Sequence, residues 1–187
     1  MNELVKYING IAPLDKQASD DFVKDFKTKS FRKNELLLKP GEVCKYFYFM
    51  EQGLTKSFSY HKDKEFIMAF YEENMMFTEL ASYLSEKPSK YMLMALENTT
   101  VKYIHRELIE KLCKKHHSIE TLIRKLFTIT SGCFMERISE MLEENAKERY
   151  SNFVNDYPTL LQRISLGDLA NYIGITQVSL SRIRAAN

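Results

Sequence analysis

The chain has 187 residues, of which 44 % are hydrophobic, 12 % aromatic and 28 % charged. This composition is that of a globular protein and excludes an intrinsically disordered chain, and the length allows one large domain or two small ones. With 27 basic and 25 acidic residues the net charge is +2. Overall charge therefore neither requires nor excludes a nucleic-acid partner, and any basic surface must be local.

No stretch of the sequence predicts a membrane span or a secretory signal. The longest segment without a charged residue, Leu169 to Ser181, is shorter and more polar than the 18 or so apolar residues of a spanning helix. The first residues lack a basic run followed by an apolar run, so we expect a cytoplasmic protein without a membrane partner. Cys44, Cys113 and Cys133 are widely spaced and predict reduced, mostly buried thiols rather than disulfides or a metal site.

The period of the apolar residues changes twice along the chain. From Met1 to about Lys29 apolar residues recur at three- and four-residue steps, which predicts helices. From Phe31 to Ile104 short apolar or alternating runs are separated by turn signals such as Pro40-Gly41, which predicts a small antiparallel sandwich or barrel. From Arg106 onward the helical period returns.

A long helix is predicted from Ser118 to about Glu144. Its apolar residues step by three and four positions, namely Ile119, Leu122, Leu126, Ile129 and Cys133. This spacing is typical of a helix that packs along a partner helix, and it is equally typical of a helix that lies on its own domain. A new helix start at Asn145, with a glutamate three residues later, places a domain boundary near Glu144.

The last segment predicts two short helices joined by a sharp corner. Ser165 and Asp168 form a capping-box pattern, Gly174 suits the end of the first helix, and Thr176 suits the start of the second. This is the spacing of a helix-turn-helix, although an αα-corner in any helical domain has the same pattern. The predicted outward face contains no acid, and the candidate DNA-binding residues are Thr176, Gln177, Val178, Ser179, Ser181, Arg182 and Arg184.

The order of helix, short-strand roll, long helix and helix-turn-helix resembles the Crp/Fnr family of bacterial transcription regulators. The strongest local match runs from Leu169 to Arg184 and is similar to the branch whose chains stop just after this helix, as here at Asn187. The resemblance places the base-reading positions on Gln177, Val178 and Arg182. It also implies a homodimer, a two-fold symmetric double-stranded DNA site, RNA polymerase as a further candidate partner, and a small-molecule effector.

The sensor half matches the family less closely. In the cyclic-nucleotide-binding members a Gly-Glu-Leu segment and an arginine about ten residues later hold the ligand, whereas here Thr78 replaces the glycine and the window from Ser85 to Tyr91 contains no arginine. Lysine does not reproduce the bidentate fork of arginine, so we expect no cyclic nucleotide effector. The candidate effector-pocket residues are Thr78, Glu79, Leu80, Ser89, Lys90 and Tyr91. No cofactor or metal is predicted, and the sequence does not identify the effector.

Together these patterns predict an α+β protein with three parts. An N-terminal double-stranded β-roll (jelly-roll-like) sensor domain occupies residues 1–116, a dimerisation helix residues 117–144, and an all-α helix-turn-helix domain residues 145–187. The predicted function is an effector-controlled, dimeric, sequence-specific transcription regulator. The near-neutral charge and the lack of a wing after Asn187 leave open an effector-binding signalling module without productive DNA binding. The sequence contains neither G-x-G-x-x-G nor H-E-x-x-H, and no enzyme is predicted.

Overall fold

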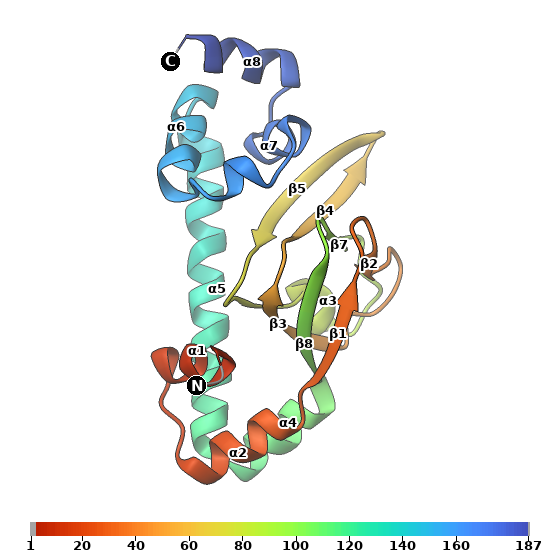
Figure 1. Cartoon of the computed structure of the whole chain (residues 1–187), viewed down its shortest axis with the longest axis vertical. Coiled ribbons are helices and arrows are strands. Elements are labelled where there is room, and N and C mark those ends of the chain that lie inside the picture. The colour runs from red at the N-terminus through yellow and green to blue at the C-terminus, as the bar shows by residue number, and fades with distance from the viewer. Residues whose placement is uncertain (1–2, 187) are drawn as a thin grey trace.

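The computed structural model describes residues 3–186 and arranges them along one long helix (Figure 1). The helices are α1 (Glu3–Ile11), α2 (Lys16–Lys24), α3 (Leu80–Ser85), α4 (Arg106–Lys115), α5 (His117–Glu143), α6 (Ala146–Asp156), α7 (Leu166–Ile173) and α8 (Gln177–Ala185), with a short 3-10 turn over Leu160–Gln162. The strands are β1 (Lys27–Phe31), β2 (Leu36–Leu38), β3 (Tyr46–Gln52), β4 (Thr55–His61), β5 (Lys64–Tyr71), β6 (Met76–Phe77), β7 (Met92–Ala95) and β8 (Thr99–His105).

The strands form a β-roll of two antiparallel sheets. One sheet has the order β1-β8-β3-β6 and the other the order β2-β7-β4-β5, with four strands in each. Phe49, Leu93 and Val101 are fully buried and belong to one core shared by both sheets and the N-terminal helices. The predicted α+β class and the predicted roll are therefore confirmed.

The prediction of helix as far as Lys29 is wrong. Helix α2 ends at Lys24, and Lys27–Phe31 is strand β1, which pairs antiparallel with β8. All residues of β1 except Phe31 are exposed, so the segment lacks the apolar alternation that identifies a strand in the sequence. Its conformation comes from pairing with β8 at the edge of the sheet. The short α3 and β6 were not predicted.

The two ends of α5 have different surroundings. Its first half packs into the core of the roll beside α1 and α4, and its second half extends to the C-terminal helices (Figure 1).

Helix α6 starts at the predicted capping box, in which the Asn145 and Glu148 side chains each accept a hydrogen bond from the other residue's backbone N–H. No helix in residues 3–186 has the length and apolar character needed to cross a membrane.

A second core joins the C-terminal helices to the roll. Phe153, Leu169 and Leu180 are buried in it together with Leu54, which precedes strand β4. Phe70 of β5 packs at the edge of the same cluster and contacts the rings of Phe153 and Tyr172. The helical domain is thus fixed on the β4–β5 hairpin by apolar contacts.

Candidate nucleic-acid interface and sensor cavity

Helices α7 and α8 form the predicted corner. Gly174 follows α7 with φ of 86°, a left-handed conformation that favours glycine. The Thr176 hydroxyl caps α8 by accepting from the Ser179 N–H at 3.1 Å. Ala170, which is 1 % exposed, and the fully buried Leu180 pack in one cluster, which fits a small residue where the two helices cross.

The outward face of α8 is exposed. Of the predicted DNA-binding residues, Ser179 is half-buried and six are exposed, namely Thr176, Gln177, Val178, Ser181, Arg182 and Arg184. The Gln177 side chain lies so close to Gly167 that a Cβ there would meet its Nε2 at 2.7 Å. The part of α8 that the structure describes contains no acid, so its exposed surface carries only neutral and basic groups.

The start of α7 is where it was predicted, but the capping interaction differs. The Ser165 hydroxyl accepts from the Asp168 N–H at 2.9 Å, as the pattern requires. The Asp168 carboxylate accepts from the Ser165 hydroxyl and from Lys56 of β4, each at 2.6 Å, rather than from the Ser165 backbone. A capping residue is therefore also a contact between the helical domain and the roll.

Lys56 is the centre of this contact. Its ammonium lies 2.6 Å from Asp168 of α7 and 2.9 Å from Glu65 of β5, and its side chain is only 7 % exposed. Asn171 of α7 donates to the same Glu65 at 3.2 Å. Burial alone would lower the pKa of Lys56, but the two carboxylates offset this effect and the pKa is raised. The lysine is therefore charged when the domains are docked.

A second ion-pair cluster holds the segment before α7. Arg163 donates to both carboxylate oxygens of Glu73, at 2.8 and 2.9 Å, and to Glu97 at 2.6 Å. Partial burial would raise the pKa of Glu73, but the Arg163 bonds and the Gly53 N–H lower it. Neither ion-pair cluster was predicted, because the pairs that join the helical domain to the roll connect residues 66 to 112 positions apart and no local spacing relates them.

A sensor cavity of about 320 Å³ lies between the roll and α5. Its wall includes Thr78, Glu79, Leu80 and Tyr91 of the predicted pocket, together with residues not predicted: Ser57, Met68, Tyr71, Ala81, Leu84 and Phe134. Ser89 and Lys90 were also predicted, but they are not among the lining residues. Ser89 is buried and its hydroxyl accepts from the Tyr91 N–H, while the Lys90 ammonium lies over the Tyr91 ring.

Glu79 has a structural role in this cavity. Its carboxylate accepts from the N–H groups of Ala81 and Ser82 and caps α3. No lysine or arginine lines the cavity within the described part of the chain. An anionic phosphate would therefore be buried without a cation to balance its charge, which agrees with the expectation against a cyclic nucleotide.

Three of the five residues of the predicted dimer seam are covered by their own chain. Ile119, Leu122 and Leu126 are at most 5 % exposed and belong to the core of their own chain, and Ile129 and Cys133 line a cavity beside β5. The sequence pattern identified an apolar stripe but not the part of the protein that packs on it. In the structure the roll and the N-terminal helices pack on this stripe. The predicted burial of most thiols is also wrong, since Cys44 is buried, Cys113 half-buried and Cys133 exposed.

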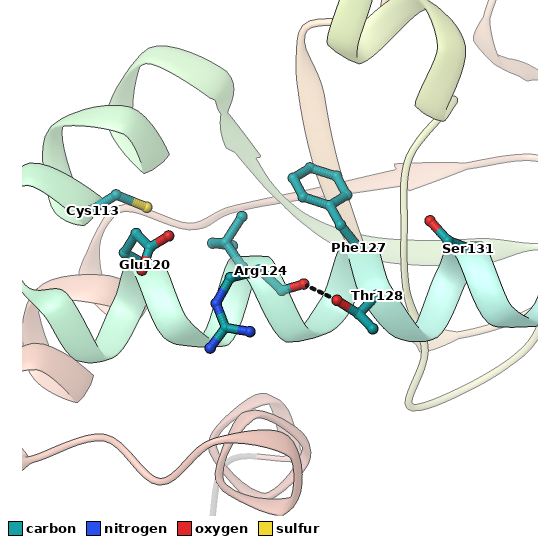
Figure 2. A pocket seen from close by; sticks show the side chains of 7 residues that line it. Cys113, Glu120, Arg124, Phe127, Thr128 and Ser131 are labelled. Carbon is teal, nitrogen blue, oxygen red and sulfur yellow. Dashed lines mark hydrogen bonds between the residues drawn. The ribbon is translucent and has the colours of Figure 1, made fainter.

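The free face of α5 is on the opposite side. At about 100° per residue, Met135, Ile138 and Leu142 lie roughly 180° from the buried stripe, and they are 66, 52 and 81 % exposed. The same face continues toward the start of the helix with Arg124, Thr128 and Ser131. Figure 2 shows these three residues with Glu120 and Phe127 of α5 and Cys113 of α4 along a shallow groove. We call the six-residue stripe from Arg124 to Leu142 the outer stripe.

Known proteins resemble this chain in sequence and in architecture. A family model described as cyclic nucleotide-binding domain matches residues 28–116. The fumarate and nitrate reduction regulatory protein of Vibrio cholerae is 25 % identical, and the match covers 84 % of this chain and 67 % of that protein. The anaerobic regulatory protein of Haemophilus influenzae is 24 % identical, with 84 % of this chain and 65 % of that protein covered. This chain thus spans about two thirds of the length of these relatives.

Solved structures have the same fold. FixK2 from Bradyrhizobium japonicum has a TM-score of 0.74 at 22 % identity, covering 86 % of this chain and 83 % of that chain. The regulator CLP of Xanthomonas campestris, described as responsive to c-di-GMP, has a TM-score of 0.72 at 13 % identity, covering 90 % and 89 %. Fold and site define a regulator in which a cyclic nucleotide-binding type of roll is joined to a helix-turn-helix. In sequence and fold the chain is similar to the Crp/Fnr-like regulators, as the resemblance predicted.

Proposed function

We propose that this protein is a homodimeric, sequence-specific DNA-binding transcription regulator whose DNA affinity is controlled by a ligand of the β-roll domain. The observation that supports it most directly is the exposed face of α8, which has Arg182 and Arg184 and no acid. Such a face can approach DNA phosphates without repulsion, and arginine can bond a guanine edge through two N–H groups. RNA polymerase is a candidate partner, and the DNA partner places the protein in the cytoplasm.

We propose the same three parts of the chain that the sequence pattern predicts. Residues 1–116 form the sensor domain, residues 117–144 the dimerisation helix, and residues 145–187 the DNA-binding domain; residues 1, 2 and 187 lie outside the described range. The curated relatives are regulatory proteins, and we propose that this chain likewise has no enzymatic activity. Within residues 3–186 no group of three or more His, Cys, Asp or Glu side chains is placed to hold a metal ion.

The outer stripe of α5 is the dimer interface in this proposal. Its residues step by four, three, four, three and four positions, which is the spacing of a coiled-coil seam. Three large apolar side chains on one exposed helix face would otherwise remain in water. Thr128, Ser131 and the adjacent Gly132 are small, and a Cβ added to Gly132 would meet nothing within 4 Å, so a second helix could approach closely there.

Selection from random DNA duplexes, followed by mobility-shift titration at stated salt concentration, tests the proposal. We expect a two-fold symmetric motif, and we expect Arg182→Ala to weaken binding to it by about ten- to a hundredfold while non-specific binding changes little. Thr176→Ala should weaken binding to all sequences alike, as loss of a phosphate contact does. Lys33→Ala is the matched control, because it removes an exposed cation on the roll.

The proposal fails if selection enriches no symmetric motif, or if Arg182→Ala binds the enriched site as tightly as the parent protein. The effector-binding module without DNA binding is then the remaining interpretation.

A further inference from the structure

A second cavity lies where the roll, α5 and the helical domain meet. This junction cavity has a volume of about 300 Å³. Strand β5 contributes Met68, α5 contributes Ile129 and Cys133, and the helical domain contributes Phe153, Tyr157 and Tyr172. The cavity is partly open to solvent, and a concave, mainly apolar wall with a few polar groups is typical of small-molecule sites.

The junction cavity adjoins the sensor cavity. Met68, Tyr71 and Phe134 line both of them. Met68 is the extra residue of a β-bulge, since Ser57 pairs with Ala69 and Phe58 with Ile67. Its side chain is flexible and 38 % exposed, so a ligand can displace it without disturbing the core. A molecule in the junction cavity would therefore touch both the wall of the sensor cavity and the DNA-binding domain.

The charged groups of the two cavities exclude one class of ligand. In the described chain their charged lining residues are Glu79, Glu136, Glu140 and Arg137. Arg137 is already engaged, since it donates to Glu140 at 2.7 Å and to the Tyr172 carbonyl and lies 4.0 Å from the centre of the Tyr172 ring. In the junction cavity an anion would meet the carboxylates of Glu136 and Glu140 and no uncommitted cation, which makes its burial unfavourable.

We infer that the junction cavity binds an apolar molecule without negative charge, and that this ligand contacts α6 and α7 directly. The inference deepens the proposed function, because it assigns a ligand class to the effector and gives that ligand a direct contact with the DNA-binding domain. Its test requires no DNA, so it can fail or succeed independently of the transcription-regulator proposal.

Two dyes of similar shape and different charge test the ligand class. N-phenyl-1-naphthylamine is uncharged, and 8-anilinonaphthalene-1-sulfonate is an anionic analogue of it. In fluorescence titrations of the full chain we expect the neutral dye to bind at one molecule per chain, and the anionic dye to bind at least about tenfold more weakly, because its sulfonate would be buried without a partner. Equal or tighter binding of the anionic dye overturns the inference.

The chain contains its own reporter for the location. Cys133 is exposed and lines the junction cavity, whereas Cys113 lies in the groove on the other side of α5 and burial raises its pKa to about 11. We expect the neutral dye to slow the alkylation of Cys133 by iodoacetamide at least about threefold, as followed by peptide mass spectrometry, and to leave the slower alkylation of Cys113 unchanged. Protection of Cys113 alone, or of neither thiol, overturns the inference.

A blocking variant completes the test. Ile129 is 52 % exposed and lines the cavity, so Ile129→Trp should fill space there without removing a core residue. We expect this variant to lose about tenfold or more of the affinity for the neutral dye. Glu143→Trp on the same helix is the control, because Glu143 is exposed and is not a lining residue. Unchanged binding by Ile129→Trp, or equal loss in both variants, overturns the inference.

Discussion

The contact between Lys56 and Asp168 makes a sharp prediction about how the helical domain is held. Lys56 is 7 % exposed, and its two carboxylate partners Glu65 and Asp168 are 14 and 13 % exposed. Breaking a fully buried ion pair by removing one partner costs about 3–5 kcal/mol. Lys56→Met leaves two carboxylates facing each other at a contact that retains slight access to water, so we expect a loss of about 2–4 kcal/mol in the free energy of unfolding.

Asp168→Asn should cost less, about 1 kcal/mol, because Lys56 keeps Glu65 and the amide oxygen can still accept a hydrogen bond. The double variant should be less unstable than the sum of the two losses by about 1–2 kcal/mol, since each single change removes the same pair. The cycle also cancels the loss of a negative charge at the start of α7. Urea unfolding followed by circular dichroism gives all four values, with Lys33→Met as a control for loss of an exposed lysine.

The pH dependence of the same contact has a definite sign. The pKa of Lys56 is raised in the folded state, so its contribution is complete below the unfolded pKa of about 10.4 and is lost as pH rises through the folded pKa. The contact should therefore hold unchanged through neutral pH. Additive single variants, or a Lys56→Met protein within about 0.5 kcal/mol of the parent, would refute the reasoning.

Three further predictions concern the interface, the acid range and the ligand. Leu142→Glu should give a folded monomer in analytical ultracentrifugation, whereas Leu126→Glu, which places a charge in the core, should prevent folding; a dimeric Leu142→Glu protein would contradict the outer stripe as interface. Because the pKa of Glu73 is lowered, its contribution to stability is present above the unfolded pKa of about 4.3 and is lost as pH falls through the folded pKa. The urea midpoint should therefore decline below about pH 4, and Arg163→Met should flatten this decline; an equal decline in that variant would contradict the assignment. Calorimetry should show no micromolar binding of cyclic AMP, because no cation lines the described sensor cavity, and micromolar binding abolished by Glu79→Ala would show the opposite.

The sequence predicted the elements whose signals are local. The period-two runs identified most strands, and the caps at Asn145, Ser165 and Thr176 identified the starts of α6, α7 and α8. Each of these signals depends on residues within a few positions of one another. They can be predicted from the sequence because the hydrogen bonds that fix them form within one helix or turn. Strand β1 was not predicted, because its pairing with β8 connects residues about 70 positions apart.

The sequence also determined the chemistry of the helix-turn-helix surface. The residues of α8 that face away from Leu180 follow from the helical period alone, and the structure leaves them exposed as that period predicts. Their roles on DNA stay a prediction. In the sensor half the sequence showed that no arginine lies between Glu79 and Tyr91, but only the fold shows that no lysine lines the described cavity either.

What the tertiary structure decided was which surface covers each apolar stripe and which distant charges meet. The stripe of Ile119, Leu122 and Leu126 has the same spacing whether a second chain or the roll covers it, because helical periodicity records only that one face avoids water. Because the roll and α1 pack against that face, the candidate dimer interface lies on the other side of α5. Likewise, the pairing of Lys56 with Asp168 depends on how the helical domain docks on the β4–β5 hairpin, and no local rule relates two residues that lie 112 positions apart.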